Sequence, residues 1–165
     1  NSVIINYDEQ SENLFNWYQQ LIAESLGKKN KGLLPIISSM PRDNHSVMQL
    51  YLDGFKKNFF TFFNVNEKIS TKIINKDILS PYNFIKNKSI SNITYAQKKA
   101  TENIFKKKKI PFRSFEIKKR DEKTLGELFC FFMLETILIS KALKVNPYDQ
   151  PAVETIKKET RGILI

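Results

Sequence analysis

The sequence predicts an α/β fold, a three-layer αβα sandwich in which a mainly parallel sheet lies between two layers of helices. Helical and strand patterns alternate along the chain, which implies helical crossovers between parallel strands. The 165 residues suit a single domain, 1–165, with one core. Apolar residues make up 41% of the chain and include 13 Phe, which is enough bulky material for a packed interior.

The first half of the chain contains two helical patterns and two strand patterns. Apolar residues recur at helical spacing over 12–26, so a helix is expected there. The short apolar run 33–39 is expected to be a buried strand. A turn at 41–44 leads into a predicted helix at 45–54, and the aromatic run 58–65 predicts a second strand.

The second half begins with the least regular part of the sequence. Residues 66–91 mix Lys, Asn and Ile and are expected to form an excursion with a short strand or turn. A polar helix is predicted at 92–107, a third strand at 110–118, a long central helix at 124–143 and a last helix at 152–160. We expect the three predicted strands to be neighbours and mostly parallel, because helices separate them.

The net charge of +10 raises the question of a polyanionic partner. Lys, Asn, Ile and Phe are all abundant and Arg is scarce, at four residues, which is the skew that an AT-rich coding sequence produces. We therefore interpret the charge mainly as compositional drift, although a positive field would still steer a phosphorylated substrate. A basic nucleic-acid-binding domain is the alternative, but no motif interleaves aromatic and basic residues, and no nucleic-acid partner is predicted.

Several absences bear on the compartment. No apolar run reaches the roughly 18 residues of a membrane span, so no membrane partner is predicted. Cys130, the only cysteine, lies among phenylalanines. It is expected to be a buried free thiol, and a reducing cytoplasm is the natural location. The chain starts without Met and without a signal-peptide pattern, so we expect it to be part of a longer protein.

Glu24 is the first candidate catalytic residue. It stands near the end of the helix predicted at 12–26 and is followed by Ser25, Gly27 and Lys28, so its carboxylate can be directed into a cleft. A carboxylate in a cleft can act as a general base. An ordinary surface glutamate fits the same pattern, and the residues alone leave its role open.

His45 is the only histidine, and it lies in the loop after the predicted strand 33–39. Ligands of parallel sheets bind at the carboxyl ends of strands, where such loops lie. A helix N-terminus disfavours the imidazolium form, so a ring at the start of the helix predicted at 45–54 would be neutral and able to take or give a proton. A structural or surface role fits this histidine equally well.

Gln150 and Lys157 are seven residues apart, about two helical turns, and so share one face of the last predicted helix. An amide and a cation on one face could hold an oxygen-rich ligand. The alternative is a solvated helix with a pair between Glu154 and Lys158. The sequence has no glycine-rich phosphate loop, and one His and one Cys make a zinc site implausible, so no cofactor and no metal are predicted.

Three segments, taken together and in order, resemble the glucose-6-phosphate isomerase family. Residues 17–28 are similar to the family's catalytic-glutamate motif, 43–49 to its histidine motif and 149–157 to its C-terminal signature. The helix around 125–132 also resembles the family. The resemblance covers most of the chain and is weakest over 66–107.

The resemblance implies a C-terminal sugar-isomerase (SIS) domain of an enzyme of glycolysis and gluconeogenesis. That enzyme interconverts glucose 6-phosphate and fructose 6-phosphate through an enediolate. Glu24 would move the proton between C1 and C2, His45 would assist ring opening with Lys157 near the ring oxygen, and Gln150 would hold the substrate. In this family the histidine reaches the site from the neighbouring subunit, which implies a homodimer.

The sequence departs from the family pattern in places. Ala152 replaces the usual glycine of the C-terminal signature, and Leu26 stands where a small or polar residue is common. The family's phosphate-binding Ser/Thr loop and Gly-Gly-Arg motif belong to an N-terminal half that this sequence lacks, so its own N-terminal SIS domain is an expected partner. A non-catalytic sugar-phosphate-binding domain and a bifunctional glucose/mannose phosphate isomerase remain alternatives. The retained Glu24, His45 and Lys157 argue against the first, since a non-catalytic binding domain has no need of a base.

Overall fold

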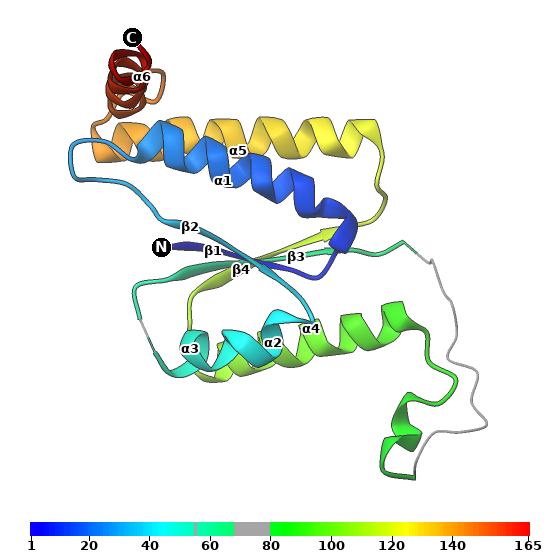
Figure 1. Cartoon of the computed structure of the whole chain (residues 1–165). Coiled ribbons are helices and arrows are strands. Elements are labelled where there is room, and N and C mark those ends of the chain that lie inside the picture. The colour runs from blue at the N-terminus through cyan, green and yellow to red at the C-terminus, as the bar shows by residue number, and fades with distance from the viewer. Residues whose placement is uncertain (55, 68–79) are drawn as a thin grey trace.

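The computed structural model describes residues 1–54, 56–67 and 80–165 and shows a parallel sheet between two layers of helices (Figure 1). The strand order is β2-β1-β3-β4, and each adjacent pair runs parallel. Helices α1 and α5 cover one face, and α2, α3 and α4 cover the other (Figure 1). The predicted α/β three-layer architecture is confirmed. The strands are β1 (Ser2–Asn6), β2 (Pro35–Ser39), β3 (Phe59–Val65) and β4 (Phe112–Ile117), and the helices are α1 (Glu12–Leu26), α2 (Asp43–Ser46), α3 (Met48–Asp53), α4 (Ile90–Lys107), α5 (Glu122–Leu143) and α6 (Pro151–Leu164), with 3-10 turns η1 (Glu9–Ser11) and η2 (Ser80–Ile85).

The central strand β1 is an element that the sequence analysis did not predict. It lies between β2 and β3, with Ile4 paired to Ile37 on one side and to Thr61 on the other. The expectation that the predicted strands are neighbours is therefore right for β3 and β4 but wrong for β2 and β3. All five β1 residues are buried, because both faces of a parallel sheet are covered by helices.

The core is divided by the sheet into two aromatic-rich layers. Ile4 of β1 packs toward α1 and α5, in a layer with Phe15, Tyr18 and Phe132. The alternate β1 residues, Val3 and Ile5, pack on the opposite face with Phe105 of α4. Tyr51, Phe60 and Phe62 belong to the same layer. Alternation of side chains along the strand thus anchors both helical layers to one central element.

The irregular segment predicted at 66–91 is only partly described. Residues 68–79 lie outside the described residues, and 80–85 form η2. Helix α4 then starts at Ile90, where the Ser89 hydroxyl accepts a hydrogen bond from the Asn92 backbone N–H at 3.1 Å. Among the described helices, none is both long and apolar enough to cross a membrane.

Helix α5, the long central helix predicted at 124–143, buries only one face. Leu128, Phe132, Thr136 and Ser140 point into the core. Its opposite face leaves apolar side chains exposed, among them Phe131, Leu134 and Leu138. Cys130 is also exposed, so the prediction of a buried thiol is wrong. It fails because a continuous apolar run on a helix does not tell which side faces the sheet.

Candidate active site

The end of α1 is a tight turn that fixes the position of Glu24. The Gly27 backbone N–H donates to the Ala23 carbonyl at 3.1 Å. A Cβ at Gly27 would lie 2.8 Å from that oxygen, so only glycine fits without a shift of the backbone. The chain then reverses through left-handed conformations at Lys29 and Asn30, with φ of 55° and 58°. Glu24, one turn before the glycine, is half-buried beside this loop.

Glu24 lies in a cavity of about 300 Å³ formed by the end of α1 and the start of α6. The Gln150 amide donates to Glu24 Oε2 at 2.9 Å, across 126 residues of sequence. The Gln20 amide, one helical turn before Glu24, donates to Oε1 at 2.8 Å. Both carboxylate oxygens therefore accept a neutral amide donor, which orients the group and leaves it able to accept a proton.

Lys28 connects the two walls of this cavity. Its ammonium lies 3.0 Å from Asp149 Oδ1 and also donates to the Asn146 carbonyl, although the Lys28 side chain is only 8% exposed. The hydrogen bond from Lys28 holds the pKa of Asp149 below its usual range. Lys31 adds a hydrogen bond of 2.9 Å to the Leu143 carbonyl at the end of α5. These contacts hold the loop before α6, and with it Gln150, against α1.

Helix α6 begins directly after Gln150, with Pro151 in its first turn, where the missing N–H costs nothing. Lys157 lies two turns further along this exposed helix. Its ammonium is 2.7 Å from Glu154 Oε1. Lys157 is not among the residues that line the Glu24 cavity, and it borders a separate surface hollow toward the end of α6.

His45 occupies a different part of the molecule. The single helix expected at 45–54 is in fact two short helices, α2 and α3, interrupted at Val47, where φ is −118°. His45 is the third residue of the four-residue helix α2 and is exposed, so it lies within one turn of a helix start, in the connection after β2 where the sequence places it. The helix begins two residues earlier than predicted, at Asp43, whose Oδ2 accepts the Ser39 backbone N–H at 2.8 Å.

Asp43 also fixes the connection from β2 to His45. Partial burial opposes ionisation of this carboxyl. The hydrogen bonds from the Arg42 guanidinium, the Ser39 backbone and the Ser46 hydroxyl outweigh that effect, so the pKa of Asp43 is lowered. The ionised carboxylate therefore holds the β2–α2 turn in one conformation, and that turn presents His45 to solvent.

The structure thus brings together two of the four predicted site residues. Glu24 and Gln150 share a cavity, whereas His45 lies after β2, under the opposite face of the sheet from α1 and α6 (Figure 1). Sequence reasoning missed Gln20, whose spacing of four residues before Glu24 places it on the same helix face and could have signalled the contact. It also missed the Asn146 carbonyl, for which no sequence signal exists because any residue supplies a carbonyl.

Comparison with known proteins finds relatives that share one name, glucose-6-phosphate isomerase. No family model matches the sequence. The chain is 38% identical over 165 residues to a glucose-6-phosphate isomerase of Mycoplasmopsis pulmonis, a match that covers 98% of this chain and 39% of that protein. It is 33% identical over 162 residues to a glucose-6-phosphate isomerase of Methanocaldococcus jannaschii, covering 95% of this chain and 39% of the relative. The chain therefore spans about two fifths of the length of these relatives.

Two solved structures share the fold. A hypothetical protein from Thermus thermophilus superposes with a TM-score of 0.90 at 24% identity, over 99% of this chain and 41% of that protein. A glucose-6-phosphate isomerase from Chlamydia trachomatis superposes with a TM-score of 0.78 at 16% identity, over 99% of this chain and 34% of the enzyme. At these identities the superpositions show a common architecture.

Proposed function

Because this chain belongs to the glucose-6-phosphate isomerase family, we propose that it is the C-terminal SIS domain of a longer enzyme that interconverts glucose 6-phosphate and fructose 6-phosphate. The reaction would proceed through an enediolate and serve glycolysis and gluconeogenesis in the cytoplasm. One observation carries the proposal: the Gln150 amide meets the Glu24 carboxylate at 2.9 Å beside a cavity. The two residues are 126 positions apart in the sequence, so their contact is not a consequence of local chain geometry.

In the proposed mechanism Glu24 is the base. A proton on carbon is a weak acid, so its removal needs a carboxylate fixed next to the reacting carbon. The two amides on Glu24 supply that orientation, and Gln150 would transfer its hydrogen bonding to a substrate hydroxyl when the sugar enters. The carboxylate would take the proton from one carbon and return it to the neighbouring carbon, so the enzyme ends each turnover unchanged.

Ring opening is a separate act, and His45 and Lys157 are its proposed agents. Opening the ring moves protons between oxygens, a task suited to an imidazole together with an ammonium. Within one chain His45 lies under the opposite face of the sheet from α6 (Figure 1). This separation favours a homodimer in which each subunit lends His45 to the other's site, and Lys157, which lies outside the Glu24 cavity, would reach the ring oxygen from α6.

The exposed face of α5 supports a further part of the proposal, docking of the enzyme's own N-terminal SIS domain. Leu138 is 66% exposed and Leu134 is 55% exposed, and Phe131 continues the same stripe. Helix α6 adds Ile156 at 66% exposure. About three fifths of the relatives' length lies outside this chain, and contiguous apolar surface usually marks a contact with another polypeptide. That N-terminal part would bind the phosphate.

A coupled dehydrogenase assay on the full-length enzyme tests this proposal. We expect conversion of glucose 6-phosphate, and a loss of about 10²–10⁴-fold in Glu24→Gln. Glu12→Gln, at the exposed start of the same helix, is the matched control and should keep wild-type activity. Binding of sugar phosphate without turnover by the wild type would indicate the non-catalytic alternative. Turnover of mannose 6-phosphate as well would indicate the bifunctional one.

A further inference from the structure

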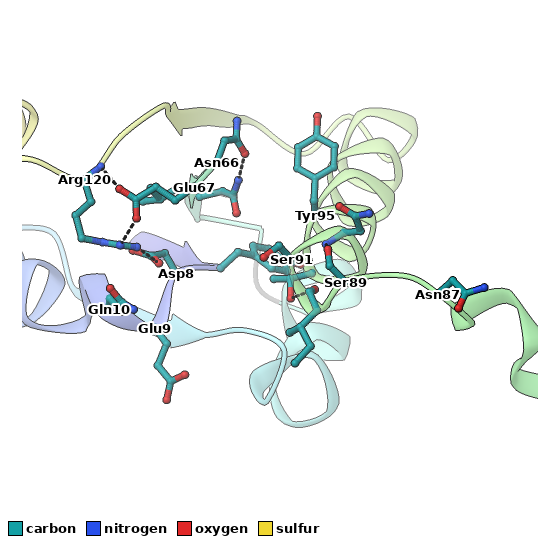
Figure 2. Close-up of a pocket in the computed structure, with 16 residues that line it drawn as sticks. Asp8, Glu9, Gln10, Asn66, Glu67, Asn87, Ser89, Ser91, Tyr95 and Arg120 are labelled. Carbon is teal, nitrogen blue, oxygen red and sulfur yellow. Dashed lines mark hydrogen bonds and ion pairs between the residues drawn. The ribbon is translucent and has the colours of Figure 1, made fainter. Parts of the chain in front are cut away.

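A second cavity, of about 720 Å³, opens at the carboxyl ends of β1 and β3 (Figure 2). From β1 the chain passes to β2 on one side and later to β3 on the other, so this edge is the point where the strand order reverses. Crevices at such points are the usual ligand positions of open parallel sheets. The cavity shares no lining residue with the one that holds Glu24, so the proposed isomerase chemistry does not use it.

Arg120, the one cation among the described residues of the cavity wall, is already paired with carboxylates. Its two terminal nitrogens each lie 2.7 Å from a carboxylate oxygen, one of Asp8 and one of Glu67 (Figure 2). Glu67 also accepts the Arg120 backbone N–H at 2.6 Å. With Glu9, the lining residues that the structure describes include three carboxylates and one cation, although the protein as a whole carries a net charge of +10. The local charge therefore disfavours phosphates and other anions.

The rest of the wall consists of neutral groups that form hydrogen bonds and of aromatic rings. Amides and hydroxyls come from η1, from the end of β3 and from the start of α4, and they include Gln10, Asn64, Asn66, Ser89, Asn92 and Thr94. Tyr95, a residue that is 40% exposed, stands at the edge (Figure 2). Amides and hydroxyls can each donate and accept, as can the hydroxyls of a polyol, and an exposed tyrosine ring offers a flat apolar face.

We propose that this cavity binds an uncharged polyhydroxy compound, a sugar or sugar alcohol without a phosphate group. Its volume falls within the roughly 300–1,000 Å³ of small-molecule sites. The carboxylates of Asp8 and Glu67, held in place by Arg120, act as fixed acceptors for ligand hydroxyls, and Tyr95 packs against the carbon face. The site discriminates against the phosphorylated sugars that the proposed active site takes, so the two sites respond to different pools of metabolite.

Saturation-transfer NMR and calorimetry on the full-length protein test the proposal, with sorbitol, D-glucose and maltose as uncharged probes and gluconate as an anionic probe. We expect at least one uncharged probe to bind, with little dependence on salt, and gluconate to bind more weakly. Tyr95→Ala should weaken binding about fivefold, since it removes the stacking face. Tyr82→Ala removes a tyrosine that is 54% exposed and does not line the cavity, and it should bind like the wild type.

A second variant tests the charge argument. Glu67→Gln removes one of the two carboxylates on Arg120, and it should raise the affinity for gluconate several-fold while leaving the folded structure intact by circular dichroism. The proposal is overturned if no uncharged probe binds, if Tyr95→Ala and Tyr82→Ala weaken binding equally, or if gluconate binds the wild type as tightly as the uncharged probes do.

Discussion

Replacing Lys98 with methionine should strongly destabilise the fold. The Lys98 side chain is fully buried between α4 and β4, where its ammonium lies 2.8 Å from Glu102 Oε1 and 3.1 Å from Glu116 Oε1. Glu102 is itself only 4% exposed. Two other groups remain on Glu102 in the variant: the Ser114 hydroxyl at 2.7 Å and the Lys99 ammonium at 3.3 Å.

The expected cost follows from these partners. Removing one member of a buried ion pair costs about 3–5 kcal/mol, because the other charge is left buried. Since Ser114 and Lys99 still stabilise the buried charge of Glu102, we expect a loss at the lower end of this range, about 3 kcal/mol of unfolding free energy. The matched control is Lys123→Met. Lys123 is 85% exposed and lies 3.9 Å from Glu127, so the loss there should stay below about 1 kcal/mol.

Urea unfolding followed by circular dichroism measures both costs. In the wild type, burial raises the pKa of Glu102, but hydrogen bonds from Lys98, Ser114 and Lys99 outweigh it and the pKa is lowered. Its stabilising contribution is therefore present above the unfolded value of about 4.3 and is lost as the pH falls through the lower folded value. The difference between wild type and Lys98→Met should shrink below about pH 4. Equal costs for Lys98→Met and Lys123→Met at pH 7 would refute this reasoning.

The remaining predictions concern the site and its surroundings. Mixing inactive Glu24→Gln and His45→Ala enzymes should restore activity at one of the two sites of each hybrid dimer, because that site combines an intact Glu24 with an intact His45 from the other subunit; hybrids with no activity would place both residues in one chain. Gly27→Ala should lower the free energy of unfolding by about 1–3 kcal/mol, seen as a lower thermal unfolding temperature, since the new Cβ would lie 2.8 Å from the Ala23 carbonyl oxygen. Gly126→Ala, where a Cβ has no neighbour within 4 Å inside a helix, should instead stabilise by up to about 1 kcal/mol. The 165-residue chain alone should show no isomerase activity in a coupled assay, because much of the catalytic energy comes from binding the remote phosphate; near-normal turnover would contradict that expectation.

Local pattern predicted most of the helices and strands. Helix α1 has the predicted bounds, 12–26, because amphipathic spacing and a terminal glycine determine them together. Strand β1 was missed because its apolar run is only three residues long, Val3 to Ile5, and carries no alternation; its burial follows from a sheet that is covered on both faces. For the same reason the neighbours of β2 and β3 were assigned incorrectly, since strand order depends on contacts that one sequence does not display.

The candidate site was predictable in its parts and not in its assembly. Residue type and spacing singled out Glu24 and Gln150, but no periodicity links positions 126 residues apart, and their hydrogen bond depends on how the loop before α6 folds back on α1. The ion pair between Lys28 and Asp149 holds the loop in that position, and the local sequence pattern does not reveal this pair. The bounds of the helix at His45 were not predictable, since it begins two residues earlier, at Asp43, and is interrupted at Val47.

Exchange with solvent of the C2 proton of glucose 6-phosphate, or of a C1 proton of fructose 6-phosphate, tests the central claim, that Glu24 is the isomerisation base, most directly. Full-length wild type, Glu24→Gln and Glu12→Gln would be incubated with fructose 6-phosphate or glucose 6-phosphate in deuterated water and followed by NMR, with sugar-phosphate affinity measured by calorimetry. Our account predicts that Glu24→Gln loses exchange by about 10²–10⁴-fold and keeps nearly normal affinity, while Glu12→Gln exchanges at the wild-type rate. Exchange at the wild-type rate in Glu24→Gln would contradict the assignment of the base.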